Sequence, residues 1–233
     1  MGTVKEERTY SSPLRERQAA ATRRAVLAAA RDLFVEQGYG ATTVDQIAAR
    51  AGVSKPTVFT AVGNKQTVLS AVRDVAMAGD DEAVAVRDRP LAQEIRSEPD
   101  QRRAVRLLGE LVTGIGRRYA DIHQVLSGAV GSGDPGVRTL WETSEAQRLT
   151  GARLWADALN AKGGFREGVD VDTAVDVLWL YMAPDHYHRL VRERGWPTER
   201  FQQWLVETLS QQLLPDEPAR PAGPAGTADG VVP

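Results

Sequence analysis

The chain reads Gly52-Val-Ser-Lys-Pro-Thr-Val-Phe-Thr-Ala-Val-Gly-Asn64 in its first third, which is the pattern of a turn, a short capped helix and the start of another helix. Ser54 is a good N-cap, and Pro56 then falls in the first turn, where its missing N–H costs little. Val53 and Val58 are spaced as a hydrophobic staple. We therefore expect a helix that begins at Ser54 and turns a polar face outward.

The segment before this helix has the pattern of a supporting helix. Thr43 and Gln46 are spaced as a capping box, and Gly52 can close the helix. Its apolar stripe consists of Val44, Ile47, Ala48 and Ala51. Two short helices joined by a turn that contains glycine are typical of a helix-turn-helix, a DNA-binding motif.

Two longer helices are expected on either side of this motif. The first carries Val26, Leu27, Ala30, Leu33 and Phe34 and ends at Gly38, which we expect to be left-handed, with Tyr39 packed back on Phe34. The other is capped by Asn64 and carries Val68, Leu69, Val72, Val75 and Ala76. The N-terminal part should therefore be a compact bundle of helices.

At this point the sequence resembles the TetR family of bacterial transcriptional regulators. The resemblance covers about residues 23–72 and rests on four pieces in the order and spacing of the family: Ala28-Ala-Ala-Arg-Asp-Leu-Phe34, Gly38-Tyr-Gly-Ala-Thr-Thr-Val44, Ile47-Ala-Ala-Arg-Ala-Gly-Val-Ser54, and Lys65 followed by Val68-Leu69. It implies a DNA-binding regulator, most often a repressor, that binds a palindromic operator as a homodimer and is released by a small-molecule effector.

The resemblance also assigns provisional roles at DNA. It implies phosphate contacts for Thr57 and Lys65, and for the helix starts near Thr43 and Asn64, where unpaired N–H groups attract anions. Lys55, Pro56 and Thr60 are candidates for base edges. A solvated surface lysine is the simpler interpretation of Lys55 alone.

Two positions depart from the family pattern. Phe59 stands where tyrosine is most common, so a hydroxyl contact to phosphate is missing, and the Phe59 ring could instead lie against sugar or thymine methyls. Val62 replaces a common phenylalanine. These departures keep an alternative open: a helical module of the same fold that binds a small molecule or a protein and has lost specific DNA binding.

Charge and composition limit the other classes. Residues 1–76 carry 11 Lys and Arg against 7 Asp and Glu, so the positive charge lies with the helix-turn-helix although the whole chain has a net charge of −2. The chain has no cysteine, no apolar stretch long enough for a membrane span and no signal-peptide core. We therefore expect a cytoplasmic protein.

The motifs of enzymes and metal sites are missing from the sequence. His186 and His188 are two residues apart and would diverge on a helix. There is no phosphate-cradling glycine loop and no Ser/His/Asp arrangement with supporting spacing. We expect no catalysis, no metal and no cofactor.

The rest of the chain has helical periodicity and no strand alternation, so we expect an all-α fold: a three-helix helix-turn-helix domain followed by a larger helical domain for ligand binding and dimerisation. The expected divisions are a flexible arm (1–14), the DNA-binding domain with the start of a connecting helix (15–78), a linker or loop (79–99), the helical domain (100–214) and a disordered tail (215–233). The arm carries Lys5 and Arg8, with Arg15 and Arg17 just beyond it; they could enter a minor groove, or the segment could be a mere leader.

The larger domain should contain separate stripes at 107–115 and 122–130, a long helix over 137–159, a helix from 171 kinked at Pro184, and a last helix opened by Pro197. The resemblance implies that the last two helices form the dimer interface. Aromatic side chains there suit either an interface or the protomer's own core: Trp179, Tyr181, Tyr187, Trp196, Phe201 and Trp204. Candidate walls of an effector pocket are Leu111, Ile115, His123, Trp141, Trp155, Trp179 and Met182, each of which could equally be a plain core residue.

Overall fold

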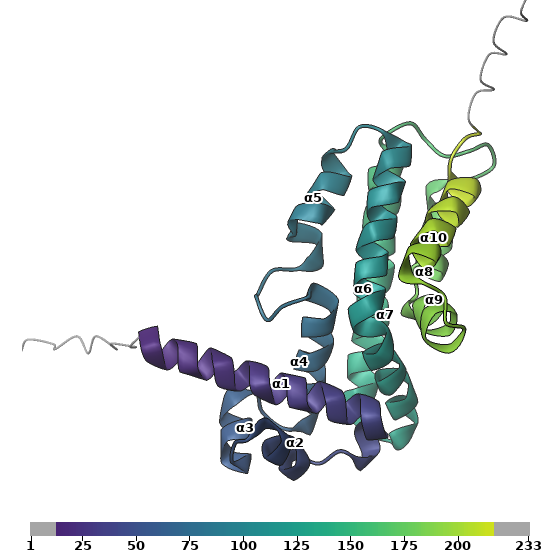
Figure 1. Ribbon diagram of the computed structural model, residues 1–233. Coiled ribbons are helices and arrows are strands. Elements are labelled where there is room, and N and C mark those ends of the chain that lie inside the picture. Colours follow the sequence, from purple (N-terminus) through teal and green to yellow (C-terminus); the bar gives the residue numbers. More distant parts are fainter. Residues whose placement is uncertain (1–12, 217–233) are drawn as a thin grey trace, which may run out of the picture.

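A computed structural model describes residues 13–216, and within that range the chain is helical with no strand (Figure 1). The N-terminal head consists of α1 (Pro13–Ala41), α2 (Val44–Ala51), α3 (Lys55–Ala61) and α4 (Lys65–Ala78). The body consists of α5 (Pro90–Ser97), α6 (Gln101–Ala129), α7 (Pro135–Asn160), α8 (Val171–Tyr181), α9 (Pro184–Tyr187) and α10 (Thr198–Leu213). The expected all-α fold is confirmed.

Local signals in the sequence set the boundaries of the short helices in the head. Thr43 and Gln46 form the full capping box of α2, and Gly52 closes that helix in the left-handed conformation, with φ 68° and ψ 31°. Ser54 caps α3 and Asn64 caps α4, each by accepting a backbone N–H three residues on. The helix starts therefore lie where the sequence predicts them.

The end of α1 differs from the expectation in one respect. Gly38 has a positive φ of 80°, but its ψ of 167° is not that of a left-handed helix. Such a backbone conformation is essentially restricted to glycine. The chain therefore kinks at Gly38, and Tyr39 still packs against Phe34, with ring centroids 5.8 Å apart.

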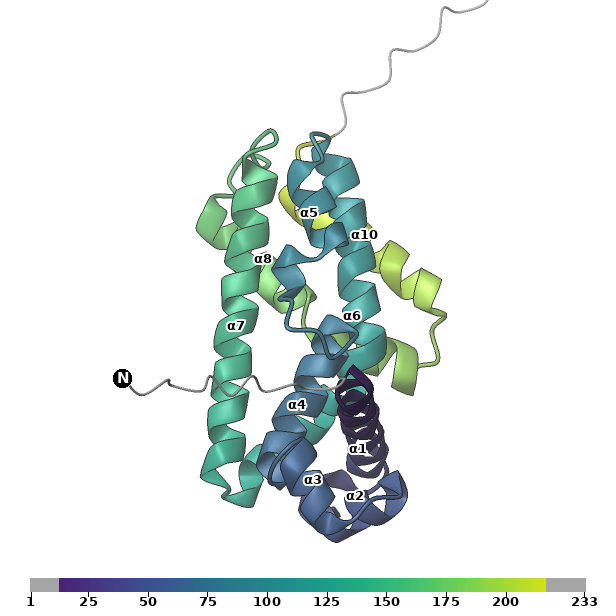
Figure 2. The same ribbon diagram turned by 90° about the vertical axis from the view of Figure 1, so that its left-hand side faces the viewer.

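The body is built around the long helices α6 and α7 (Figures 1 and 2). Helix α8 packs mainly on α7, while α10 packs mainly on α6. The two stripes predicted at 107–115 and 122–130 belong to the single helix α6, so the expectation of two elements was wrong. The chain leaves α7 through a turn at Gly163 and Gly164, both with positive φ.

The helix that was expected to kink at Pro184 is instead interrupted. Helix α8 ends at Tyr181, and Pro184 occupies the first turn of α9, where proline is favourable. Helix α9 continues into a π-helical turn, His188–Glu193. Pro197 precedes α10 as its N-cap, as predicted.

Residues 79–99 are not simply a linker. They contain the 3₁₀ turn η1 (Val86–Asp88) and helix α5, which begins at Pro90 and packs on α6. Ala92 and Ile95 are fully buried in the body core. The segment was misread because Arg89-Pro90 resembles a helix breaker, whereas proline at the first position begins a helix.

The hydrophobic core of the head extends into the body. Tyr119, Ile122 and Leu126 of α6 and Val137 of α7 belong to the same buried cluster as the side chains of α1 to α4. The second cluster joins α5, the N-terminal half of α6 with Ala120, and helices α7 to α10. The expected DNA-binding domain (15–78) and helical domain (100–214) therefore do not have separate cores, because most of the buried side chains in the C-terminal half of α6 belong to the head's core.

Several expectations fall at the ends of the chain. Helix α1 begins at Pro13, so Arg15 and Arg17 lie on a helix rather than on a loose arm. Residues 1–12, including Lys5 and Arg8, and residues 217–233 lie outside the described range, and the expected arm and tail lie mostly there.

Candidate DNA-binding surface and effector-binding body

Helix α3 presents its polar side to solvent. Val58 is fully buried in the core of the head, while Phe59 is 47% exposed. The exposed side chains are those expected on the outer face, namely Lys55, Pro56, Phe59 and Thr60. The Ser54 hydroxyl accepts the Thr57 N–H at 3.3 Å and lies 2.7 Å from the Thr57 hydroxyl, so the first turn is held rigidly.

Some polar groups of this surface have partners within the protein. The Lys55 ammonium donates to Asp45 of α2 at 2.9 Å, but both side chains are at least half exposed. The Thr60 hydroxyl donates to the Pro56 carbonyl at 3.0 Å. The ion pair between Lys55 and Asp45 is exposed and therefore weak, so Lys55 can leave Asp45 for another anion at little cost in free energy. Asp45 was not singled out in the sequence, because a pair ten residues apart has no local signal.

The two cap residues expected near phosphates lie at exposed helix starts. The Thr43 hydroxyl accepts the Gln46 N–H at 3.2 Å, and the Asn64 Oδ1 accepts the Thr67 N–H at 2.9 Å. Both caps are exposed, so the starts of α2 and α4 are open to an anion approaching along the helix axis.

Lys65 lies in a different setting from the one expected of a phosphate contact. Its ammonium donates to the carbonyls of Tyr39 and Thr42, both at 2.8 Å, and lies 4.1 Å from the centre of the Tyr39 ring. Burial lowers its pKa, partly opposed by nearby Asp134. The side chain therefore ties the start of α4 to the last turn of α1 and to Thr42, which follows α1.

Tyr39 continues this connection to the body. Its hydroxyl donates to Asp134, the N-cap of α7, at 3.1 Å. Burial and the adjacent carboxylate raise the pKa of Tyr39 to about 12, so the phenol is protonated at neutral pH. Lys65, Tyr39 and Asp134 thus join the start of α4, the end of α1 and the start of α7.

The seven predicted pocket residues do not surround one cavity. Ile115 and Trp141 pack on the head's core, whereas Leu111, Trp155 and Met182 pack in the body core. Trp179 is 36% exposed and lies beneath the Arg148 guanidinium, 4.2 Å from the ring centre. Two described surface hollows have volumes of about 330 and 460 Å³, and their linings include none of the seven.

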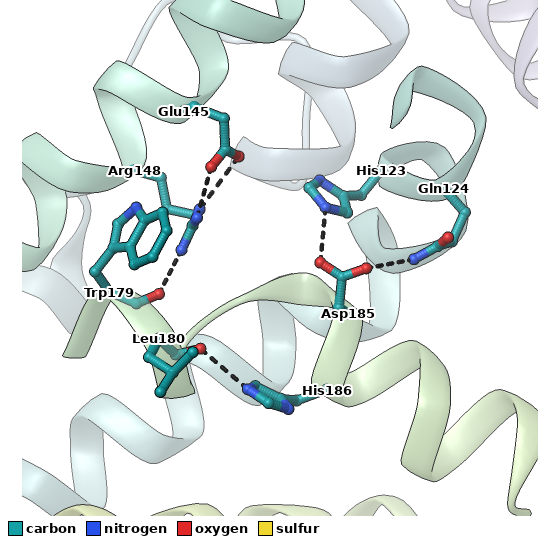
Figure 3. A network of polar contacts seen from close by, with 8 residues as sticks. All are labelled: His123, Gln124, Glu145, Arg148, Trp179, Leu180, Asp185 and His186. Atoms are coloured by element: carbon teal, nitrogen blue, oxygen red, sulfur yellow. Dashed lines mark hydrogen bonds and ion pairs between the residues drawn. The ribbon is translucent and has the colours of Figure 1, made fainter. Parts of the chain in front are cut away.

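His123 lies in a polar network between the body helices (Figure 3). Only 3% of the residue is exposed, and its Nε2 lies 3.1 Å from Asp185 Oδ2, while the Gln124 amide donates to the other Asp185 oxygen at 2.8 Å. Burial lowers the pKa of His123, although Asp185 opposes this. Burial raises the pKa of Asp185, but its contacts with Gln124 and His123 outweigh this and lower it overall.

The same network closes the end of α8. The Arg148 guanidinium is paired with Glu145 at 2.6 Å and donates to the Trp179 carbonyl, and His186 Nε2 lies 3.0 Å from the Leu180 carbonyl (Figure 3). Both carbonyls belong to the last turn of α8, where carbonyls lack donors from the helix itself, and the Leu180 carbonyl also accepts the Ala183 N–H at 3.2 Å. The network therefore fixes where α8 stops and α9 begins.

Residues 26–72 match the model of the family described as bacterial regulatory proteins, tetR family. These residues therefore form a DNA-binding domain of the TetR type. A Bacillus subtilis (strain 168) relative, the uncharacterized HTH-type transcriptional regulator YdeS, is 28% identical over 176 residues, which cover 73% of this chain and 79% of YdeS. The matched segment contains the whole predicted helix-turn-helix, and both similarities support DNA-binding transcriptional regulation.

Solved structures of the family share the fold beyond the matched segment. SmeT in its complex with triclosan has a TM-score of 0.65 at 20% identity, with coverage of 88% of this chain and 99% of SmeT. FadR from Bacillus subtilis in complex with stearoyl-CoA has a TM-score of 0.59 at 17% identity, with coverage of 80% and 96%. Within residues 13–216, the chain contains no helix with the length and apolar character of a membrane span.

Proposed function

We propose that this TetR-family regulator binds a palindromic operator as a homodimer, represses transcription there and is released by a small-molecule effector. The observation that carries the proposal is helix α3, a short helix fixed by its Ser54 cap and by buried Val58 that turns Lys55, Pro56, Phe59 and Thr60 to solvent. A rigid helix with an exposed polar face is what reading the major groove requires.

The roles at DNA divide between bases and phosphates. Lys55 can leave its exposed partner Asp45 and donate to guanine O6 and N7, while Pro56 and the Thr60 methyl suit thymine methyls. Thr57 and the exposed starts of α2 and α4 position the phosphate backbone. Phe59 supplies an exposed apolar ring to the same face, for sugar or thymine methyls.

Dimerisation is proposed through α8 and α10. One short helix reads only a few base pairs, and a two-fold dimer places two such helices about one DNA turn apart. Of the six aromatic residues considered for the interface, Tyr187 and Phe201 are buried within the protomer, whereas Trp179 is exposed. Leu180, which is 51% exposed, lies next to Trp179 on α8 and leaves an apolar surface for a second copy.

An effector is proposed to act within the body. Two structural neighbours are in complex with small molecules, triclosan and stearoyl-CoA, which supports a ligand for this chain without naming it. The effector must bind the DNA-incompetent arrangement more tightly, and it can act only to the extent of that preference. Because α6 contributes to both cores, a ligand that moves α6 also moves the head.

Selection from random duplexes, combined with light scattering of the purified protein, tests the proposal. We expect enrichment of a dyad-symmetric site, a dimeric mass and an affinity that falls steeply with salt. Lys55→Ala should relax the preference at one position of each half-site. A monomer that enriches no symmetric sequence contradicts the proposal and favours a module that has lost specific DNA binding.

A further inference from the structure

Arg23 of α1 joins three segments that are distant in the sequence. Its Nε and Nη2 donate to the two carboxylate oxygens of Asp81 at 2.7 and 3.2 Å. Its Nη1 donates to the carbonyl of Ala61, the last residue of α3, at 3.2 Å. A guanidinium at a helix C-terminus is favourable because it meets both an unpaired carbonyl and the negative end of the helix dipole.

The segment that holds Asp81 is itself fixed by the body. The Arg118 guanidinium of α6 donates to the carbonyls of Ala76 and Met77, in the last turn of α4, at 3.2 and 3.3 Å. Arg89, just before α5, holds Asp80 through two contacts of 2.6 and 2.7 Å. The residues after α4 are therefore held by α5 and α6 on one side and by Arg23 on the other.

We propose that Arg23 is a positioning residue for DNA recognition: through Asp81 it holds the C-terminal end of α3 in register with the end of α4. Helix α3 has seven residues, and at its end the amides of Val62 and of Gly63, which has a positive φ, both return to the Val58 carbonyl. Arg23 supplies a donor to a different carbonyl of this last turn, that of Ala61. If the C-terminal end of α4 moves relative to α6, the movement is then transmitted to α3 through Asp81 and Arg23, and not only through the core of the head. The proposal rests on the proposed function.

A direct phosphate contact by Arg23 makes the opposite prediction for Asp81. If Arg23 served DNA as a free cation, then removing the Asp81 charge would release the guanidinium and remove a repulsive anion, so binding would tighten. If Arg23 positions α3, the same change loosens α3 and weakens specific binding. The sign of the effect of Asp81→Asn therefore distinguishes the two roles.

The experiment measures the affinity of the full chain for its selected operator and for an unrelated duplex, in the wild type, Asp81→Asn and Arg23→Gln. Glu98→Gln is the matched control, because Glu98 pairs with Arg103 at 2.8 Å near the end of α6 that is distant from the head (Figure 1). We expect Asp81→Asn and Arg23→Gln each to weaken operator binding by about three- to tenfold, the range of one half-exposed, charge-assisted contact. The affinity of Asp81→Asn for the unrelated duplex should stay unchanged or rise, and Glu98→Gln should match the wild type.

Hydrogen exchange on the free protein tests the contact without DNA. The Val62 and Gly63 amides both donate to the Val58 carbonyl, at 2.9 and 3.2 Å, and report on the last turn of α3. Both Asp81→Asn and Arg23→Gln should speed exchange there while the melting temperature stays close to that of the wild type.

The outcomes separate this proposal from the proposed function. Tighter or unchanged operator binding by Asp81→Asn overturns the positioning role, as does an equal loss on both duplexes. If no operator can be selected, the proposed function fails, and the exchange experiment still decides whether Arg23 holds α3: faster exchange at residues 58–63 supports it and unchanged exchange overturns it.

Discussion

Lys65 provides the sharpest test of how the head is held together. Its ammonium donates two hydrogen bonds of 2.8 Å to the carbonyls of Tyr39 and Thr42, residues that are 6% and 0% exposed, and it lies over the Tyr39 ring. At about 1 kcal/mol for each partly solvated bond, plus about 0.5–1 kcal/mol for the cation–π contact, Lys65→Met should lower the free energy of unfolding by about 2–3 kcal/mol. For a chain of this size, that corresponds to a fall in melting temperature of about 5–10 °C.

Lys55→Met is the control for this measurement. Lys55 likewise donates to an oxygen of the protein, that of Asp45, but this ion pair is exposed to solvent. Its removal should change the free energy of unfolding by less than about 0.5 kcal/mol. Urea unfolding followed by circular dichroism measures both variants, with DNA affinity recorded at several salt concentrations. If Lys65→Met unfolds like the wild type and its salt slope falls by about one, then Lys65 is a phosphate contact and the structural role argued for it is refuted.

Three further predictions concern the stability of the body. Gly116→Ala places a Cβ 2.7 Å from the ring of buried Tyr187. This substitution should lower the free energy of unfolding, measured in urea, by about 1–3 kcal/mol. An unchanged free energy would mean that α6 and α9 are not in close contact. The hydrogen bonds from Arg89 lower the pKa of Asp80 from 3.8 to about 2, so this pair stabilises the protein above pH 3.8 and its contribution is lost as the pH falls towards 2. In Asp80→Asn, the free energy of unfolding should therefore depend less on pH between about 4 and 2. An unchanged slope argues against the pair. Burial lowers the pKa of His123 from 6.5, so the unfolded chain takes up its proton first as the pH falls below 6.5, and stability drops. His123→Gln should reduce that drop in urea titrations between pH 7 and 5, leaving the part due to His186, whose pKa burial also lowers. A drop of equal size in the variant would contradict the assignment.

The head could be predicted in detail because its signals are local. Thr43, Ser54 and Asn64 each cap a helix through a contact three residues away, and Gly52 is a left-handed stop, so the pattern and the geometry coincide within one turn of chain. At Gly38, the sequence indicated a positive φ but could not distinguish between two values of ψ. The body was harder, because α5 is only eight residues long and owes its place to the burial of Ala92 and Ile95 against α6.

The residues of the candidate sites likewise divide into those that local spacing predicts and those that depend on distant partners. The exposure of Lys55 and Thr60 follows from the register of α3, which the Ser54 cap determines. The partners of Lys65 lie 23 and 26 residues away, and those of Arg23 lie 38 and 58 residues away, so neither could be read from local spacing. The pocket was inferred from six apolar or aromatic side chains and His123, and in the structure five of these seven residues pack in two different cores.

The shared core at α6 has a practical consequence for protein engineering. A fragment that stops after α4 would leave Val26, Phe34 and Leu69 without the Tyr119, Ile122 and Leu126 side chains that cover them, so an excised head should aggregate or melt early. Hybrid regulators that graft this head onto a foreign sensor should therefore retain the C-terminal half of α6 and the beginning of α7 from this chain, because both contribute side chains to the head's core.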